Sequence, residues 1–213
     1  NVLRAKTYES YEATARLHIY PQLGKIKLKD LSTNRIQKLY NYKLKAGRVD
    51  GQGGLAPRSV ERIHTVLHKA LEQAVAERKI PHNPAKATTL PTREEKEIRA
   101  LTREEQERFE ASLDRERLKA AFMVGLYAGL RRGEVLGLMW DDIDFENNTI
   151  AVKRALLRVK DKETKVSELK LEPLKSKKSY RLIPCPEELI TALRKHKAKQ
   201  AKEKLKAGPM YQD

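Results

Sequence analysis

The pattern of apolar and polar positions in the first half of the chain predicts a bundle of amphipathic helices. Apolar residues recur every three or four positions over residues 7–20, 33–46 and 57–79, a spacing that gives a helix one apolar face. A Ser-Thr pair supplies an N-cap for the second helix, and Pro57 opens the third, as prolines often do in a first helical turn. In the third helix, the residues expected to face the core are Val60, Ile63, Leu67, Ala70, Leu71, Ala74 and Val75.

The second half begins with further helices. Thr102 is followed three residues later by Glu105, and this capping-box pair places the start of a helix there. Four helices are expected, over residues 102–113, 115–128, 130–140 and 186–206. The core face expected for the second of these consists of Leu118, Ala121, Phe122, Gly125 and Leu126.

Strand patterns lie between the last two of these helices. Residues 149–159 and 180–183 alternate apolar and polar side chains, which predicts a small antiparallel sheet. A proline-interrupted, charged stretch separates the two halves of the chain, as a linker would. The predicted fold class is therefore mainly α: a helical-bundle domain over residues 1–85, a linker over 86–100, and an α+β domain over 101–213.

The charge of the chain indicates a polyanionic partner. Its 45 Lys and Arg residues outnumber 29 Asp and Glu residues, for a formal charge of +16, and both halves carry a positive excess. Nucleic acid is the simplest such partner. A membrane surface is the competing interpretation, but it generally requires a basic amphipathic helix with exposed aromatic residues. Only 6% of the residues are aromatic, which disfavours the membrane interpretation.

Three observations bear on the cell compartment. No apolar run approaches the length of a membrane span. The N-terminal residues lack the apolar core of a signal peptide. The single cysteine, Cys185, cannot form an internal disulfide and is expected to be a small buried residue. Together they predict a cytoplasmic protein that does not enter a membrane.

The helix over residues 57–79 carries a polar, basic face. Its members, three or four positions apart, are Arg58, Arg62, Thr65 and Lys69. This face fits a groove of DNA, and it equally fits the solvated surface of an ordinary bundle. His64 and His68 have the i, i+4 spacing of metal ligands, but no set of Cys, His or carboxylate residues completes a site. We therefore expect no metal, and we assign both histidines to the helix surface or to phosphate contacts.

The stretch AGLRRGEVLGLMWDDIDF combines two arginines with a helical pattern. On a helix over residues 130–140, Arg131 and Arg132 fall within the apolar arc, and the two glycines fall on the far side. A guanidinium at the edge of a core requires an anionic partner. Glu134 either neutralises Arg131 or orients it toward a ligand. A phosphate site and a structural Arg–Glu pair both fit this pattern.

A lysine-rich turn precedes the strand at residues 180–183. Lys175, Lys177 and Lys178 lie close together in this turn. They form either the solvated tip of a hairpin or a set of lysines directed at DNA.

Three segments together resemble a tyrosine recombinase of the phage integrase family. They are AGLRRGEVLGLMWDDIDF, the downstream LKSKKSYRLIP, and the IPHNPA that ends the helical first half. The resemblance spans essentially the whole chain. It implies that residues 1–85 form a core-binding, DNA-binding domain and that residues 101–213 form the N-terminal part of a catalytic domain. The implied activity is site-specific DNA recombination, with cleavage and rejoining through a 3′-phosphotyrosine intermediate.

The resemblance also assigns roles by position. Arg131 matches the family's first catalytic arginine, which grips the scissile phosphate, and Glu134 matches an acidic position that supports the active site. Lys175 matches the lysine that protonates the leaving 5′-oxygen; Lys177 or Lys178 takes this role if the turn is shorter. Arg132 stands at a variable position and receives no catalytic role. Because cationic side chains and a tyrosine carry this chemistry, no metal or nucleotide cofactor is implied.

The family's other catalytic residues have no match among the 213 residues. They are a His-x-x-Arg segment, a later His or Trp, and the tyrosine nucleophile; Tyr211 lacks the expected sequence context. We therefore expect the 213-residue chain to bind double-stranded DNA, at attachment-site core sequences, without cleaving it. The other expected partners are further copies of the protein and an excisionase or a host DNA-bending protein. The alternatives are a DNA-binding regulator without catalysis and a protein-interaction domain.

Overall fold

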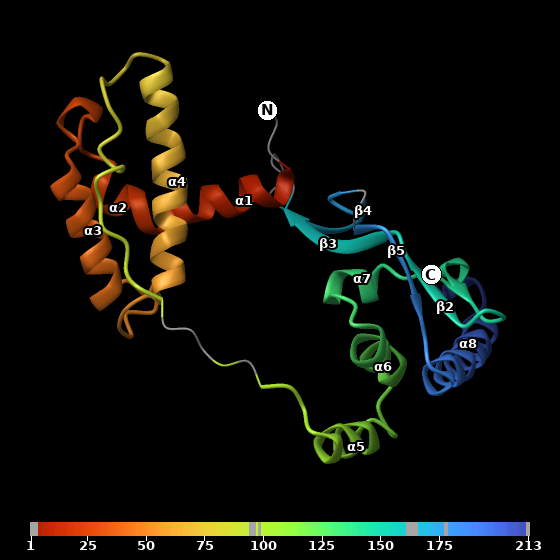
Figure 1. Ribbon diagram of the computed structural model, residues 1–213. Coiled ribbons are helices and arrows are strands. Elements are labelled where there is room, and N and C mark those ends of the chain that lie inside the picture. Colours follow the sequence, from red (N-terminus) through yellow and green to blue (C-terminus); the bar gives the residue numbers. More distant parts are fainter. Residues whose placement is uncertain (1–3, 94–96, 98, 161–165, 177–178, 212–213) are drawn as a thin grey trace. The chain divides into compact units, whose positions relative to one another are not determined.

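The computed structural model describes residues 4–93, 97, 99–160, 166–176 and 179–211 (Figure 1). The chain divides into two compact units, Asn1–Ile98 and Arg99–Asp213, and each unit has its own buried core. Helices predominate, and a small antiparallel sheet lies in the second unit, so the predicted mainly α fold is confirmed. Within the described ranges, no helix is both long enough and apolar enough to cross a bilayer.

The first unit is a helical bundle. Its helices are α1 (Ala5–Thr14), α2 (Tyr20–Leu23), α3 (Thr33–Ala46) and α4 (Pro57–Ala76), with a π-helical turn over Ala15–Ile19 and a 3-10 turn over Leu28–Asp30. The first helical segment continues past its predicted end, because Pro21 lies in the first turn of α2, where a missing N–H is tolerated. The Ser32 hydroxyl accepts a hydrogen bond from the backbone N–H of Arg35 and caps α3, as predicted.

The core of this unit lies mainly between α3 and α4. Its fully buried side chains include Ile36 and Tyr40 of α3 and Val60 and Ile63 of α4. The predicted core face of α4 is wrong at one position: Ala70 is exposed, whereas Val66, which was not assigned to the core, is buried. On the helix, Ala70 falls between the buried Val66 and Ile63, so the apolar period of α4 does not reveal that this position is exposed.

The segment after α4 packs back onto the bundle. Ala85 is fully buried, and the Asn83 side-chain amide donates to Glu72 Oε1 at 2.8 Å. The Gln37 side chain accepts from the backbone N–H of Thr89 at 2.8 Å and donates to its carbonyl at 3.1 Å. These contacts hold residues 83–89 on the surface formed by α3 and α4.

Among the described residues, the second unit has four α-helices. They are α5 (Arg103–Ser112), α6 (Lys119–Ala128), α7 (Arg132–Leu136) and α8 (Glu187–Ala207), with 3-10 turns over Trp140–Asp142 and Gly208–Met210. The predicted capping box is confirmed: Thr102 Oγ1 accepts from Glu105 N–H at 3.3 Å, and Glu105 Oε2 accepts from Thr102 N–H at 2.9 Å.

The strands of this unit form two antiparallel groups. β1 (Ile143–Asp144), β2 (Thr149–Val152) and β5 (Arg181–Pro184) make a sheet in the order β1-β2-β5, and β3 (Arg154–Lys160) pairs with β4 (Ser167–Pro173) as a hairpin. Ile150 of β2 lies opposite Ile183 of β5. Ile150 shares one buried core with Val124 of α6 and with Leu189 and Ile190 of α8.

The structure corrects the core face predicted for α6. Leu118 and Phe122 are 59% and 47% exposed, and Ala121, Gly125 and Leu126 are only partly buried. The buried residues of α6 are Ala120, Met123, Val124 and Ala128. The sequence KAAFMVGLYA is apolar around almost its whole circumference, so periodicity alone could not determine which side faces the core.

The helix predicted over residues 130–140 is also wrong in length and orientation. α7 spans only Arg132–Leu136, and Arg131 is its N-cap. α7 lies beside β3 (Figure 1), and its glycine side, predicted to lie away from the core, is the side that packs against this strand; Gly137 is buried. A Cβ atom at Gly137 would lie 2.8 Å from the backbone nitrogen of Leu156 in β3. The close approach of β3 therefore requires glycine at this position.

We expect Gly137→Ala to destabilise the second unit by about 1–3 kcal/mol, because backbone atoms of β3 would have to move. Gly125→Ala is the matched control: a Cβ there meets no atom within 4 Å, and alanine favours the helix by about 0.5–1 kcal/mol. Urea unfolding followed by the fluorescence of Trp140, the only tryptophan, reports on this unit. Equal stability of the two variants would contradict the prediction.

Candidate functional site

A buried carboxylate, Glu134, lies in the first turn of α7. The residue is only 4% exposed. Its Oε2 accepts a hydrogen bond from the backbone N–H of Arg131 at 2.9 Å, which caps the helix. Its Oε1 accepts from Arg131 Nη1 at 3.0 Å. Glu134 therefore fixes both the backbone and the side chain of Arg131.

A second arginine, Arg181 at the start of β5, binds the same carboxylate. Arg181 Nη2 donates to Glu134 Oε2 at 2.8 Å, and Nη1 donates to Oε1 at 3.3 Å. Hydrogen bonding from Arg181, more than that from Arg131, lowers the pKa of Glu134 to about 2, against the opposing effect of burial. Glu134 is thus a charged group held between two guanidinium groups.

The Arg131 side chain itself faces solvent. It is 79% exposed, and Glu134 is its one hydrogen-bond partner among the described side chains. The prediction that Arg131 and Arg132 lie in an apolar arc is wrong, because the short α7 leaves both of them exposed. An oriented, solvent-facing guanidinium can bind an anion without first breaking an internal contact.

Lys175 lies in the connection from β4 to β5 and is exposed. Beside it, the Ser179 backbone N–H donates to the Ser176 carbonyl at 3.0 Å, and the two serine hydroxyl oxygens also lie 3.0 Å apart. The carbonyl of Ser179 accepts from Arg181 Nη1 at 3.2 Å. Arg181 therefore joins this turn to Glu134. Lys177 and Lys178, the other predicted lysines, lie outside the described residues.

Sequence reasoning did not identify Arg181, although one signal for it was present. A glutamate buried at the start of α7 requires more cationic contact than one exposed arginine provides. Arg181 is the one charged residue in the apolar strand segment RLIP, so it was a candidate for a buried ion pair. The two residues are 47 positions apart, and no local pattern connects them.

A second buried carboxylate, Asp142, was also missed. It is 4% exposed, and it accepts from Arg154 Nη1 at 2.6 Å and from Arg154 Nη2 at 3.3 Å. Lys153 Nζ lies 3.1 Å from Asp142 Oδ1, the oxygen that Arg154 Nη2 also binds. These contacts join the turn after α7 to the first residues of β3, at a place separate from the Glu134 pair.

The predicted basic face of α4 is exposed and lies on one side of that helix. Its residues are Arg58, Arg62, Thr65 and Lys69. Arg62 donates to the Ser10 hydroxyl, and Lys69 Nζ donates to the Tyr11 hydroxyl at 3.0 Å, so both cations lie beside α1. Across the described part of the chain, none of the three cations forms an ion pair with a carboxylate.

One histidine of α4, His64, does not have the position predicted for it. His64 Nδ1 lies 3.1 Å from the hydroxyl of the buried Tyr40, so the half-buried His64 side chain packs toward the interior of the bundle. Burial and the neighbouring His68 lower the pKa of His64. A half-buried neutral imidazole is poorly suited to binding phosphate, and the assignment of His64 to the surface is wrong.

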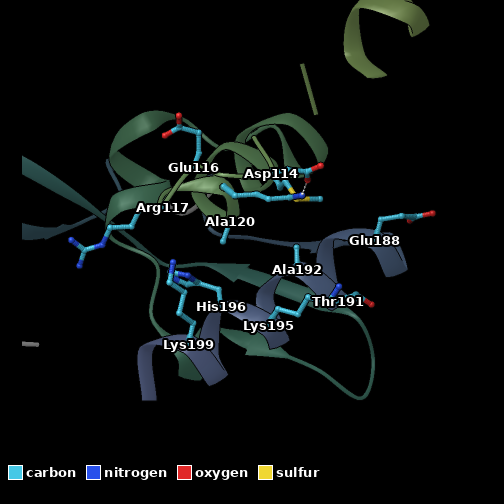
Figure 2. Close-up of a pocket in the computed structure, with 12 residues that line it drawn as sticks. Asp114, Glu116, Arg117, Ala120, Glu188, Thr191, Ala192, Lys195, His196 and Lys199 are labelled. Carbon is cyan, nitrogen blue, oxygen red and sulfur yellow. Dashed lines mark hydrogen bonds and ion pairs between the residues drawn. The ribbon is translucent and has the colours of Figure 1, made fainter. Parts of the chain in front are cut away.

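The second unit also contains a cleft of about 390 Å³ between α6, the loop before it and α8 (Figure 2). Acidic and basic side chains both line it; Asp114, Glu188, Lys195 and His196 are examples. Neither Arg131 nor Lys175 is among the lining residues. The cleft is therefore separate from the Arg131–Glu134–Arg181 site.

Comparison with known sequences and structures places these sites in context. Residues 1–44 match the family described as "Phage integrase, N-terminal SAM-like domain", and residues 93–208 match "Phage integrase family". A "Tyrosine recombinase XerC-like" protein of Caldanaerobacter subterraneus subsp. tengcongensis is 33% identical over 96% of this chain and 53% of its own length. The chain thus spans about half the length of this curated relative.

Two solved structures share the fold. The Tn1549 transposon integrase, in complex with a circular intermediate DNA, has a TM-score of 0.73 and 21% identity over 91% of this chain and 59% of its own. The lambda integrase, solved as a tetramer bound to a Holliday junction, has a TM-score of 0.57 and 23% identity over 79% of this chain and 45% of its own.

Proposed function

Because the chain belongs to the phage integrase family, whose members are tyrosine recombinases, we propose that it binds attachment-site DNA and contributes two phosphate-handling side chains, Arg131 and Lys175, to a site-specific recombinase. In this role it acts on double-stranded DNA in the cytoplasm. The longer protein breaks and rejoins one DNA strand through a 3′-phosphotyrosine intermediate.

One observation carries this proposal: Glu134 is buried between two arginines and leaves the Arg131 guanidinium oriented and exposed. Phosphoryl transfer needs fixed positive charge where negative charge develops on the phosphorane oxygens. Arg131 supplies that charge, and Glu134 fixes its direction. Lys175 supplies a proton to the leaving 5′-oxygen. Neither step requires a metal or a nucleotide.

The 213 residues alone bind DNA and do not cleave it. The sequence contains no His-x-x-Arg segment and no tyrosine in a matching context, and the chain spans about half of a curated relative, so this proposal assigns the nucleophile and the second catalytic arginine to residues outside these 213. Further copies of the protein bind beside it on the DNA, and an excisionase or a host DNA-bending protein acts with it.

Binding by the basic face of α4 is expected to depend steeply on salt, because each neutralised phosphate releases counterions. Arg58→Ala, Arg62→Ala and Lys69→Ala should each weaken binding to attachment-site DNA and reduce the slope of log K against log salt by about one. Fluorescence anisotropy at several salt concentrations measures both quantities.

Lys79→Ala is the control for these variants, because Lys79 lies beyond the end of α4 and is paired with Glu77 at 2.6 Å. It should leave the affinity and the slope unchanged. An unchanged dissociation constant for all three α4 variants would remove this face from the interface. Binding with no salt dependence would favour a protein-interaction domain instead.

A DNA-binding regulator without catalysis is the second candidate, favoured by the net charge of +16 alone. It predicts that Arg131→Ala weakens binding modestly and that the longer protein has no cleavage activity to lose.

A further inference from the structure

Arg181 lies where two parts of the proposed site meet. Its guanidinium binds both oxygens of Glu134 and also the carbonyl of Ser179 in the turn beside Lys175. Its side chain is 31% exposed, against 79% for Arg131, so it lies deeper in the protein. One rigid, forked group therefore contacts the residue that orients Arg131 and the segment that carries Lys175.

We propose that Arg181 is a positioning residue of the recombinase site, which holds the Arg131-bearing end of α7 and the Lys175-bearing turn in a fixed relation to a single DNA phosphate. This inference rests on the proposed function. It assigns no contact with DNA to Arg181 itself.

The contacts of Glu134 explain why Arg181 matters for Arg131. Arg181 occupies both carboxylate oxygens from the strand side and leaves Arg131 a single side-chain contact, at Oε1. Without Arg181, the buried carboxylate would be free to bind Arg131 through both oxygens and draw the guanidinium away from solvent. The exposed orientation of Arg131 therefore depends on Arg181.

The contacts of the turn explain why Arg181 matters for Lys175. Ser176 and Ser179 close the turn through a backbone hydrogen bond, and Arg181 holds the Ser179 carbonyl. Without the hydrogen bond from Arg181 to the Ser179 carbonyl, the turn loses its connection to α7. A proton donor displaced by about 1 Å can lower the rate on the order of 100-fold.

The test is single-turnover cleavage by the longer protein on DNA whose scissile phosphate carries either a 5′-oxygen or a 5′-sulfur leaving atom. A thiolate leaves without a proton, so the sulfur substrate conceals the loss of a proton donor. Lys175→Ala should cleave the oxygen substrate slowly and the sulfur substrate at nearly the rate of the unsubstituted protein. Arg131→Ala should be slow on both, because the phosphorane charge still needs stabilisation.

Arg181→Ala should combine both defects: a loss of roughly 10- to 100-fold on oxygen, only partly recovered on sulfur, with DNA affinity within about 2-fold of the parent. Arg181→Lys retains the charge but not the fork, and it should show the same pattern more weakly. Cleavage of both substrates at the parent rate would overturn the inference.

Arg154→Ala is the matched control, because Arg154 forms the same two-bonded contact with another buried carboxylate of this unit, Asp142. Arg181→Ala and Arg154→Ala should both lower the thermal midpoint of unfolding. For Arg154→Ala, any loss of cleavage rate relative to the unsubstituted protein should be the same on the oxygen and the sulfur substrate. Equal rate losses for Arg181→Ala and Arg154→Ala on both substrates would assign Arg181 a purely structural role. Full cleavage by Arg131→Ala and Lys175→Ala would instead overturn the proposed function itself.

Discussion

Replacing Arg131 with alanine is expected to remove strand cleavage by the longer protein while DNA binding is largely retained. The guanidinium is exposed and oriented by Glu134, so the variant loses charge at the phosphorane without losing a core contact. Removal of one such stabilising donor typically lowers a rate on the order of 100- to 1000-fold. Single-turnover cleavage of a suicide substrate and a gel-shift titration measure the two properties.

Arg132→Ala is the control, because Arg132 is the adjacent exposed arginine and has no assigned role. It should cleave at the parent rate. Unchanged cleavage by Arg131→Ala would contradict the proposed function. A fall in affinity alone, with no cleavage in the parent, would support the DNA-binding regulator.

Replacing Glu134 with glutamine is expected to produce the largest change in stability. The carboxylate is 4% exposed and is held by two guanidinium groups. Its pKa is lowered from 4.5 to about 2, a shift that corresponds to about 3 kcal/mol in favour of the folded state at neutral pH. Glu134→Gln should lose most of that contribution, as variants that break a buried ion pair generally do.

The pH dependence follows from the direction of this shift. A carboxyl group with a depressed folded-state pKa stabilises the fold above pH 4.5, and the contribution is lost as the pH falls from 4.5 toward 2. The free energy of unfolding of the unsubstituted protein should therefore fall over this interval, and that of Glu134→Gln should fall less. Urea unfolding at pH 7 and pH 3, followed by Trp140 fluorescence, measures the difference.

Glu107→Gln is the control for this experiment, since Glu107 is an exposed glutamate of the same unit that also pairs with an arginine, Arg103. Exposed pairs contribute little to stability, so this variant should retain the parent midpoint at both pH values. Equal midpoints for Glu134→Gln and the parent at pH 7 would contradict the buried ion pair.

The helices could be predicted from the sequence wherever local chemistry specifies them. The apolar period of α4, the serine cap of α3 and the Thr102–Glu105 capping box all act within one or two helical turns. α8 was also predicted closely, and its basic second half is anchored by Trp140 Nε1, which donates to Gln200 Oε1 at 2.7 Å.

Prediction failed where distant segments decide the local structure. α7 ends at Leu136, just before Gly137, which β3 approaches closely; β3 follows only after β1 and β2 in the chain. α6 is apolar on nearly all sides, so only its neighbours determine the buried face. The site was predicted in part: Glu134 was identified as the partner of Arg131, whereas its stronger partner, Arg181, is brought to it by the fold.

The most direct test of the central claim is a structure of this chain bound to its attachment-site DNA. The claim is that Arg131 and Lys175 act on one phosphodiester. The expected result is that the Arg131 guanidinium and the Lys175 ammonium both contact the same backbone phosphate group or its bridging oxygen, with Glu134 still held by Arg181. A complex in which the two side chains contact different phosphates, or in which Arg131 faces away from the DNA, would contradict it.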